Sequence, residues 1–384
     1  MTPTSPQLLF YVQHLLGVGH VKRASIIARA LVDEGFSCHV VLGGPDAGPI
    51  DWGGAVCHRL PEVRSPDASF SRYLTGDGMA PDGSFWRDRT TRAERMAAEL
   101  KPDVLLIEHF PFGRRRFRHE IAALIDGARR VRRNVRVFSS VRDILVSGKP
   151  GDKDRKAVDI LRRDFDGVLV HGDPAFIPFS KTFSMAQEIS DLLTYTGYVT
   201  QPPLSSRPGA GRRDHGPVVV AAGGGAVGGN LMMQAMAARR DGLLADKNWV
   251  FLIGPNLDKQ TAALLRHDPP AGVSIEPNRP DYETLLSEAH VSISQAGYNT
   301  IMDLVRTRCP AVVVPLAADG ETEQRVRAEL LDERGYLVSL DEAQATPDSL
   351  SEAVERALSL DIPTGPPFRT DGASQTARAL MHNP

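Results

Sequence analysis

The feature that most constrains the fold of this 384-residue chain is the alternation of short apolar runs with longer segments of helical periodicity. The runs are continuously apolar, which is typical of parallel strands covered by helices on both faces. Residues 21–31 and 114–133 show the spacing of amphipathic helices. In the first half of the chain the predicted strands are residues 8–12, 37–42, 56–60, 104–108, 135–139, 167–170 and 193–195.

A break divides this pattern into two halves. Residues 200–217 are rich in proline, glycine, serine and arginine and cannot support a core, so they predict a linker. Beyond it we predict strands at residues 218–222, 249–253, 273–276, 291–294, 311–315 and 336–340. The expected fold is α/β: two Rossmann-like domains with parallel sheets, residues 1–199 and 218–362, and a ligand cleft between them. Residues 363–384 are expected to be a tail whose helix, residues 374–381, packs back toward the first domain.

Composition narrows the class of protein. A hydrophobic content of 42% and a charged content of 24% are ordinary for a globular chain, and a net charge of −2 gives no overall attraction for nucleic acid. Cys38, Cys57 and Cys309 lack metal-site spacing and are expected to be buried free thiols of a reducing compartment. The sequence has neither an apolar stretch of about 20 residues nor the features of a signal peptide, so a cytoplasmic protein is expected.

The first candidate site follows the first predicted strand. Gly17, Gly19 and His20 stand at a strand-to-helix turn, where glycine lets a ligand approach the backbone and a helix N-terminus favours a neutral imidazole. The third glycine of a dinucleotide fingerprint is missing here. His20 is therefore a candidate general base, and the alternative is a histidine that only caps the helix.

A second glycine turn, residues 223–229, opens the second half. It matches G-x-G-x-x-G, but the next strand ends without the acid that holds a ribose, and there is no Walker lysine. What remains is a phosphate cradle of backbone N–H groups, with Gly223, Gly224 and Gly225 as its members, or else a tight turn with no ligand.

A third turn combines glycine with polar side chains. It is expected to bind an anion through backbone donors, and Asp303, one turn further along the same helical face, could accept both hydroxyls of a ribose. Glu323 and Gln324 are candidates for binding sugar hydroxyls, whereas Glu321 could simply complement the helix dipole. The residues of the turn itself are Gly297, Tyr298, Asn299 and Thr300.

These motifs resemble a known family. AGYNTIMDL, AVVVPL and the E-x-E-Q-x-x-R-A run from Glu321 are similar to the GT-B glycosyltransferases, and most similar to family 28, whose G-x-G-H turn matches GVGH. The resemblance implies a UDP-sugar donor on the C-terminal domain and an acceptor on the N-terminal domain. It implies a ribose contact for Asp303, where the family usually has Glu, and donor-sugar contacts for Glu323 and Gln324. It further implies a phosphate loop at Gly224 and Gly225 and an active-site role for His20.

Other polar residues compete for roles. Glu108 and Asp143, each at or after the end of a predicted strand, are rival bases to His20, and Arg142 reaches the same edge. Both acids could instead be ordinary partners of nearby arginines. The arginines of residues 114–133 suit a solvated helix face, a phosphorylated or lipid-linked acceptor, or peripheral contact with a membrane. Arg279, after the strand at 273–276, is a candidate neighbour of the donor base.

The predicted function is transfer of a sugar from a nucleotide diphosphate, most simply a UDP sugar such as UDP-N-acetylglucosamine, to a hydroxyl or amine of a small-molecule or lipid-linked acceptor. His20 would be the base, and backbone donors at the glycine turns would stabilise the leaving group without a metal. No cofactor besides the nucleotide sugar is expected, and inversion at the anomeric carbon is implied by the resemblance. The alternatives are a UDP-sugar 2-epimerase of the same fold and a non-enzymatic two-domain binding protein.

Overall fold

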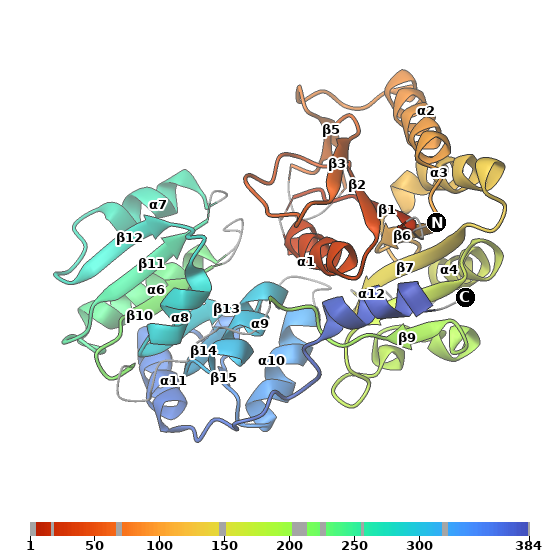
Figure 1. Ribbon diagram of the computed structural model, residues 1–384. Coiled ribbons are helices and arrows are strands. Elements are labelled where there is room, and N and C mark those ends of the chain that lie inside the picture. Colours follow the sequence, from red (N-terminus) through yellow and green to blue (C-terminus); the bar gives the residue numbers. More distant parts are fainter. Residues whose placement is uncertain are drawn as a thin grey trace. The chain divides into compact units, whose positions relative to one another are not determined.

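The chain forms two compact units in the computed structural model, which describes residues 5–16, 19–66, 71–145, 151–201, 213–222, 228–254, 257–316 and 322–382. Unit 1 comprises Met1–Gln201 and Phe368–Pro384, and unit 2 comprises Pro202–Pro367. Each unit has a parallel sheet with helices on both faces (Figure 1), so the expected α/β fold with two Rossmann-like sheets is confirmed.

The sheet of unit 1 has the strand order β3-β2-β1-β6-β7-β8-β9, and all of its pairings are parallel. The chain therefore reverses its direction of winding between β1 and β6. A short antiparallel pair, β4 with β5, lies outside this sheet. The strands are β1 (Gln7–Val12), β2 (Ser37–Leu42), β3 (Val56–Arg59), β4 (Val63–Arg64), β5 (Leu74–Thr75), β6 (Val104–Glu108), β7 (Arg136–Arg142), β8 (Gly167–His171) and β9 (Leu193–Tyr195).

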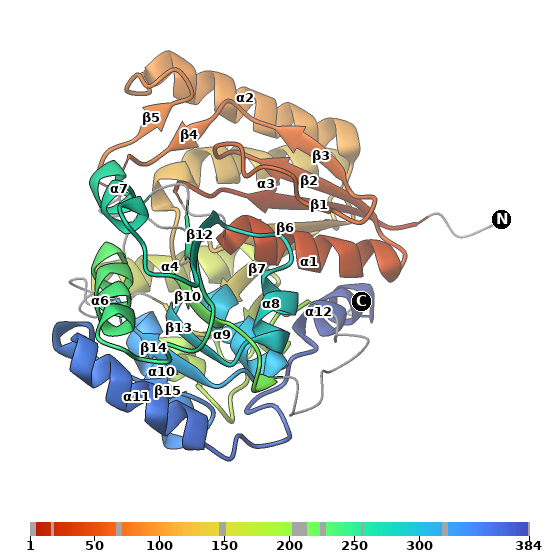
Figure 2. The same ribbon diagram turned by 90° about the vertical axis from the view of Figure 1, so that its left-hand side faces the viewer.

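Helices cover both faces of this sheet. Leu9 and Tyr11 of β1 pack on one face with Leu124, while Leu8 and Phe10 pack on the other. Figure 2 shows α2 and α3 on one side and α1 on the other. The helices are α1 (Gly19–Asp33), α2 (Gly83–Leu100), α3 (Arg118–Val131), α4 (Asp152–Asp164) and α12 (Gly372–His382), with 3₁₀ turns η1 (Arg115–Phe117), η2 (Phe179–Lys181) and η3 (Ala186–Ile189).

The C-terminal segment belongs to unit 1. Val199 forms an isolated antiparallel bridge with Asp371, and the Phe368 ring lies 4.0 Å from the Tyr198 ring. Helix α12 then packs beside α1, and Arg136 donates to the carbonyl oxygen of Leu380 at 2.8 Å (Figure 1). The last helix thus completes the layer that covers the α1 face of the sheet.

Unit 2 repeats the same architecture with the strand order β12-β11-β10-β13-β14-β15, again all parallel. Val218 and Val220 of β10 pack with Leu350 in its main core. The strands are β10 (Val218–Ala221), β11 (Trp249–Ile253), β12 (Val273–Pro277), β13 (Val291–Gln295), β14 (Ala311–Val314) and β15 (Val338–Ser339). The helices are α6 (Gly229–Arg240), α7 (Lys259–Arg266), α8 (Tyr282–Glu288), α9 (Tyr298–Thr307), α10 (Glu323–Glu333) and α11 (Pro347–Ser359), with a 3₁₀ turn η4 (Glu342–Gln344).

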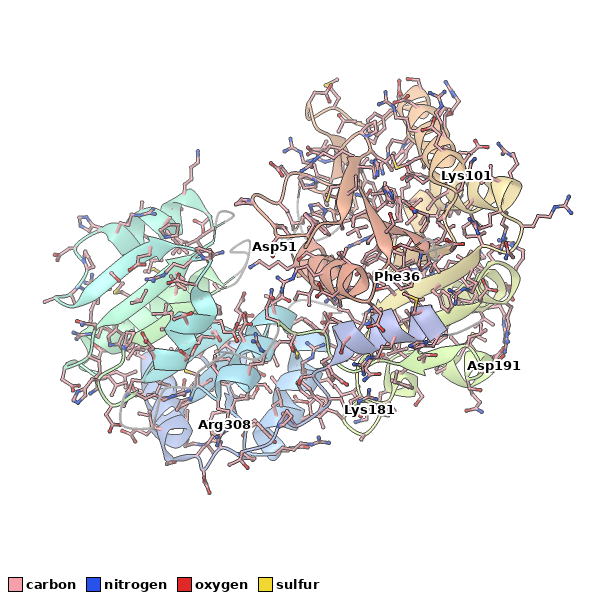
Figure 3. The ribbon with its side chains drawn as sticks, viewed as in Figure 1. Phe36, Asp51, Lys101, Lys181, Asp191 and Arg308 are labelled. Carbon is pink, nitrogen blue, oxygen red and sulfur yellow. The ribbon has the colours of Figure 1, made fainter. Side chains whose placement is uncertain are left out.

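Two helices end at residues in the left-handed region. Lys101 follows α2 with φ 47° and donates its N–H to Ala97, and Arg308 follows α9 with φ 53° (Figure 3). In both cases a long basic side chain takes the position where glycine is preferred. No helix among the residues described is both long and apolar enough to cross a bilayer.

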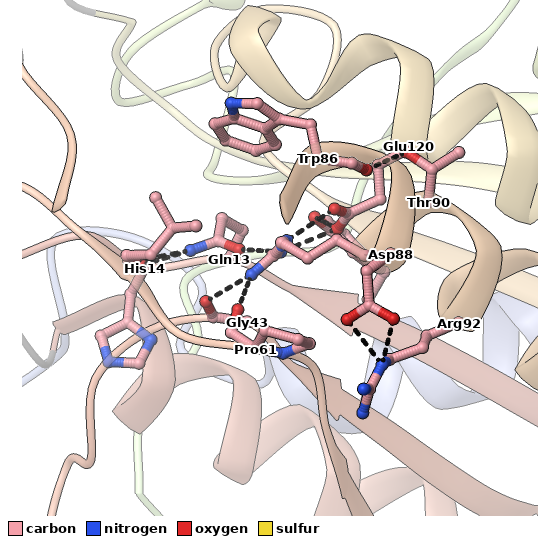
Figure 4. A network of polar contacts seen from close by, with 12 residues as sticks. Gln13, His14, Gly43, Pro61, Trp86, Asp88, Thr90, Arg92 and Glu120 are labelled. Carbon is pink, nitrogen blue, oxygen red and sulfur yellow. Dashed lines mark hydrogen bonds and ion pairs between the residues drawn. The ribbon is translucent and has the colours of Figure 1, made fainter. Parts of the chain in front are cut away.

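A buried arginine of α2 joins α3 to three loops of unit 1. Arg89 of α2 is fully buried and makes a bidentate pair with Glu120 of α3, at 2.7 and 2.8 Å (Figure 4). It also donates to Gln13 after β1, and to the backbone oxygens of Gly43 and Pro61. Every direction of the guanidinium fork is used, so this network fixes the loops at the carboxyl ends of β1 and β2.

Three sequence expectations need correction. Cys57 is exposed rather than buried, because it lies on the edge strand β3. The helix expected over residues 114–133 begins as the 3₁₀ turn η1 and becomes α3 only at Arg118, since Arg114 has a positive φ of 57°. Strand β7 extends three residues past the predicted end, to Arg142.

Candidate functional site

The candidate site of unit 1 lies where the winding of its sheet reverses. His20 is in the first turn of α1, which follows β1, and Glu108 is the last residue of the neighbouring strand β6. Crevices outside the carboxyl ends of strands at such a reversal are the usual ligand sites of open α/β sheets. Nδ1 of His20 is 2.9 Å from Oε1 of Glu108.

The partners of His20 define its tautomer. An arginine side chain can only donate, and the guanidinium of Arg142 contacts Nε2, so Nε2 carries the lone pair. Nδ1 then carries the proton that is donated to Glu108. Burial, together with the charges of Arg142, Arg114 and Arg23, holds the pKa of His20 well below its ordinary value. His20 is therefore neutral, with a basic nitrogen at Nε2.

Glu108 is a buried carboxylate with several donors. Arg23, one turn after His20 on α1, forms an ion pair with Oε1, and Ser140 donates to Oε2 at 2.9 Å. Burial, the largest single influence, acts to raise the pKa of Glu108, but Arg23, His109, His171 and the Ser140 hydrogen bond together outweigh it, so the pKa is lowered. Glu108 is thus ionised, fully buried and suited to orienting His20.

The hydrogen-bond chain continues across the sheet. The register pairs Glu108 with Ser140 and Arg142 with His171. Nε2 of His171 is 2.8 Å from the Ser140 hydroxyl, and its Nδ1 is 2.9 Å from the hydroxyl of Thr196. Burial lowers the pKa of His171 to about 3, so this ring is neutral and links β6, β7 and β8.

Asp143 occupies a different environment from the other two predicted bases. It is fully buried after β7, and its carboxylate accepts a hydrogen bond of 2.5 Å from the Tyr198 hydroxyl. A Cβ on Gly172 would lie 2.6 Å from its own Cβ, so the backbone of Gly172 closes over it. This placement favours a structural role for Asp143.

The arginines of residues 114–133 lie in different environments. Arg115, Arg116 and Arg118 are exposed, and Arg116 stacks over the Trp86 ring. Arg129, Arg130 and Arg132 pair with acidic residues of other elements, namely Asp164, Glu94 and Asp103. Arg114 alone of the group turns inward, and its Nε donates to the carbonyl oxygen of Gln13 at 2.7 Å.

In unit 2 the predicted donor residues gather at the carboxyl edge of the sheet. Helices α6, α9 and α10 follow the adjacent strands β10, β13 and β14, so their N-termini lie at one edge. Gly297 is the residue before α9, and Gly228, with φ 104°, is the residue before α6. A Cβ at Gly228 would be 2.7 Å from that of Ala222 and close to the Gln295 amide, so only glycine allows this packing.

Glu323 and Gln324 open helix α10. Glu323 is 7% exposed and lies 3.1 Å from the fully buried Arg327, whose guanidinium is stacked 5.1 Å from the Tyr298 ring. Gln324 accepts a hydrogen bond of 3.2 Å from the backbone N–H of Leu316 through Oε1. These contacts fix the positions of both side chains.

The remaining predicted donor residues are on or near α9. Asn299, Thr300 and Asp303 are partly exposed along its first turns, consistent with access to a ligand. Arg279 is instead held by its neighbours: it makes two bonds to Asp281, at 2.9 and 2.7 Å, and one to Glu276. Gly17, Gly223, Gly224, Gly225 and Glu321 lie outside the described residues.

Three further residues complete these clusters. Arg23 lies three residues after His20, a spacing that places both on one helical face, and Arg327 stands four residues after Glu323. Those spacings were visible in the sequence. His171 comes one residue beyond a predicted strand and is brought to Ser140 only by the sheet register.

Comparison with known proteins shows which families and structures this chain is similar to. Residues 219–362 match the glycosyltransferase family 28 C-terminal domain. An N-acetylglucosamine transferase of Acidiphilium cryptum, which acts on a pyrophosphoryl-undecaprenol, is 33% identical over 90 residues, 23% of this chain and 24% of that protein. The NDP-glycosyltransferase YjiC of Bacillus subtilis is 31% identical over 116 residues, 30% of this chain and 27% of that protein. The chain therefore spans about a quarter of the length of these relatives.

Solved structures show the fold over nearly the whole chain. The calicheamicin glycosyltransferase superposes with a TM-score of 0.58 at 17% identity, covering 99% of this chain and 94% of that one. MurG of Acinetobacter baumannii gives 0.55 at 17% identity, covering 98% and 99%. The chain thus has the GT-B fold, and its residues 219–362 match the glycosyltransferase family 28 C-terminal domain.

Proposed function

We propose that the protein is a glycosyltransferase that moves a sugar from a nucleotide diphosphate to a hydroxyl or amine of a small-molecule or lipid-linked acceptor. The observation that carries the proposal is the dyad of His20 and Glu108 at the reversal of the unit 1 sheet. A neutral imidazole with its lone pair on Nε2 and its other nitrogen held by a buried carboxylate is the arrangement a general base requires.

The reaction follows from this arrangement. Nε2 of His20 accepts the proton of the acceptor hydroxyl, and the acceptor oxygen attacks the anomeric carbon while the bond to the nucleoside diphosphate breaks. The charge of Glu108 stabilises the imidazolium that forms, and general base catalysis of this kind contributes roughly 10²–10⁴-fold. Attack from the face opposite the leaving group gives inversion.

Unit 2 supplies the donor site in this proposal. Asp303 accepts the ribose hydroxyls, and Glu323, paired with Arg327, accepts the donor-sugar hydroxyls together with Gln324. The backbone N–H groups at the start of α9 stabilise the diphosphate. The transferase of Acidiphilium cryptum is named for UDP-N-acetylglucosamine, and a spinosyn rhamnosyltransferase of similar fold was solved with thymidine diphosphate. We propose a uridine nucleotide, because it is the donor of the family 28 relative.

We propose that this transfer needs no metal ion, because helix N-termini can stabilise the departing diphosphate. Asp-x-Asp spacings do occur in the sequence, at residues 152–154 and 164–166. In the second of these, Asp166 accepts from the backbone N–H of Val137 at 2.7 Å, and Asp164 pairs with Arg163 at 2.7 Å. Undiminished transfer in excess chelator is the expected result, and recovery only on adding magnesium would contradict it.

A thermal-shift screen of the full chain against UDP, GDP, dTDP and their sugars tests the proposal. A ligand at 100 times its Kd raises the stability by about 2.7 kcal/mol, so UDP and its sugars should raise Tm clearly. Products are then analysed with UDP-N-acetylglucosamine alone. A new sugar nucleotide formed without an acceptor would establish the epimerase instead. If no nucleotide or nucleotide sugar raised Tm, the alternative of a protein that binds another kind of small ligand would remain.

A further inference from the structure

Arg142 covers the atom that the proposed reaction needs. Its guanidinium donates to Nε2 of His20, and an imidazole nitrogen has a single lone pair in the ring plane. An acceptor hydroxyl cannot donate to the same lone pair while Arg142 holds it. The base is therefore covered by Arg142, which must be drawn away before a proton can be transferred.

Three arginines lie around His20. Arg23 of α1, Arg114 after β6 and Arg142 of β7 each lower the pKa of His20, and His14 adds to the effect. Both carboxylate oxygens of Glu108 are already bonded. Oε1 contacts His20 and Arg23, and Oε2 accepts from Ser140. Within the described part of the chain Arg114 has no ion pair, and burial followed by the charge of Arg142 lowers its pKa to about 10.

The loop that carries Arg114 is held in an uncommon conformation. His109 and Arg114, at its two ends, both have positive φ, of 64° and 57°. A Cβ on Gly113 would lie 2.4 Å from the His109 ring, so the loop is folded tightly against that imidazole. Nδ1 of His109 is buried and has no hydrogen-bond partner among the described residues. Non-glycine residues with positive φ gather at ligand sites, where the surrounding structure outweighs the strain.

We propose that the acceptor carries an oxyanion, a phosphate or a carboxylate, next to the accepting hydroxyl, and that this group binds Arg114 and Arg142 and draws Arg142 off Nε2 of His20. This inference rests on the proposed function and gives it an acceptor class. It also makes Arg142 a positioning residue: the base is uncovered only when the acceptor is present, which suppresses attack by water on the donor.

The first experiment does not depend on any transferase activity. The imidazole resonances of His20 are followed by NMR against pH in the full chain, with inorganic phosphate, pyrophosphate or acetate as probes. Facing His20 are Arg23, Glu108, His109, Arg114, Arg142 and His14, so His109→Gln and His14→Gln spectra are needed for assignment. Arg142→Gln and Arg114→Gln are compared with Arg116→Gln, whose exposed side chain stacks on Trp86.

We expect an oxyanion to raise the pH midpoint of His20 in the wild type and in Arg116→Gln. In Arg142→Gln the midpoint is higher before any addition, and the oxyanion binds about tenfold to a hundredfold more weakly, as loss of one charge-assisted hydrogen bond implies. Phosphate or pyrophosphate acting where acetate does not would identify a phosphorylated acceptor, and the reverse a carboxylate. No response of His20 to any of the three, or equal behaviour of Arg142→Gln and Arg116→Gln, would overturn the inference.

The second experiment measures donor hydrolysis in the absence of acceptor. Arg142→Gln should raise hydrolysis relative to transfer at least about tenfold, and Arg142→Lys serves as a conservative variant should Arg142→Gln not fold. Unchanged hydrolysis in a folded variant would contradict the covering role of Arg142. If no nucleotide sugar reacts in any variant, the proposed function fails, whereas the NMR titration still decides the oxyanion site.

Discussion

Nδ1 of His20 lies 2.9 Å from Oε1 of Glu108, although the two residues are 88 positions apart in the chain. The contact exists because α1 starts after β1 while β6, which ends at Glu108, is the neighbour of β1 on the other side of the winding reversal. It links a histidine in the first turn of a helix to a carboxylate at the end of a buried strand. The tautomer and the orientation of His20 follow from this contact and from Arg142, whereas its neutrality follows from burial and from the arginines around it.

Replacing Glu108 with Gln should weaken both folding and activity. The substitution leaves the buried Arg23 without its ion-pair partner, which costs about 3–5 kcal/mol of unfolding free energy. It also removes the charge that stabilises a protonated His20, so kcat should fall. Urea unfolding and steady-state kinetics measure the two effects. The exposed Glu99→Gln on α2 is the control, expected within about 0.5 kcal/mol of wild type; equal stability of the two variants would contradict the buried pair.

The Arg89 network predicts a contrast between two arginines of one helix. Arg89→Ala leaves Glu120 charged, buried and unpaired, and should cost about 3–5 kcal/mol. Arg92→Ala removes an exposed i,i+4 pair with Asp88 and should cost only about 0.3–0.5 kcal/mol. Figure 4 shows the Arg92–Asp88 pair. Thermal and chemical unfolding of the two variants is the measurement, and comparable losses would show that burial does not govern the energy of the network.

His171 predicts a dependence of stability on pH. In the folded protein its pKa is about 3, whereas the unfolded chain takes up this proton below about pH 6.5. Unfolding therefore binds a proton in this window, and stability that is present above about pH 6.5 is lost toward pH 3 by about 1.4 kcal/mol per pH unit. His171→Gln should reduce the slope of unfolding free energy against pH by that amount. An unchanged slope between about pH 4.5 and 6.5 would mean that His171 is not buried in its neutral form.

The donor site predicts a contrast on helix α10. Glu323→Gln removes a carboxylate held by Arg327 and should raise the donor KM about tenfold to a hundredfold, as expected for a hydrogen bond to a charged group. Glu329→Gln, on the same helix with 57% of its side chain exposed, should leave the donor KM unchanged. Nucleotide-sugar kinetics with both variants tests this. A Glu323→Gln enzyme with the wild-type donor KM would remove Glu323 from the donor site.

Much of the fold could be predicted because strands buried on both faces leave long apolar runs. The strands at 37–42, 104–108, 193–195 and 249–253 begin and end where the pattern placed them. The prediction that Cys57 is buried was wrong because β3 is an edge strand. Which strand lies at the edge depends on the strand order, which no local sequence pattern contains. The predicted start of the helix at residue 114 was wrong because Arg114 has a positive φ, and its side chain contacts Gln13, which is far away in sequence.

The candidate site was predictable where one helix carries both partners. His20 with Arg23 and Glu323 with Arg327 stand three and four residues apart, so helical spacing joins them. The contacts of Glu108 with His20, and of Ser140 with His171, depend on which strands are neighbours and in which register. That information arises only from the assembled sheet. For the same reason the sequence favoured His20 as the base but kept Glu108 and Asp143 as rivals, because their surroundings could not be predicted.

The central claim is that His20 is the base of a glycosyl transfer whose donor is held by unit 2. The most direct measurement is the kcat of His20→Ala for transfer together with the Kd of the same preparation for UDP. We predict a kcat lower by about 10²–10⁴-fold, an unchanged Kd, and wild-type behaviour of the exposed His119→Ala on α3. Retention of transfer by folded His20→Ala, or a loss of UDP binding in place of a loss of kcat, would contradict the claim.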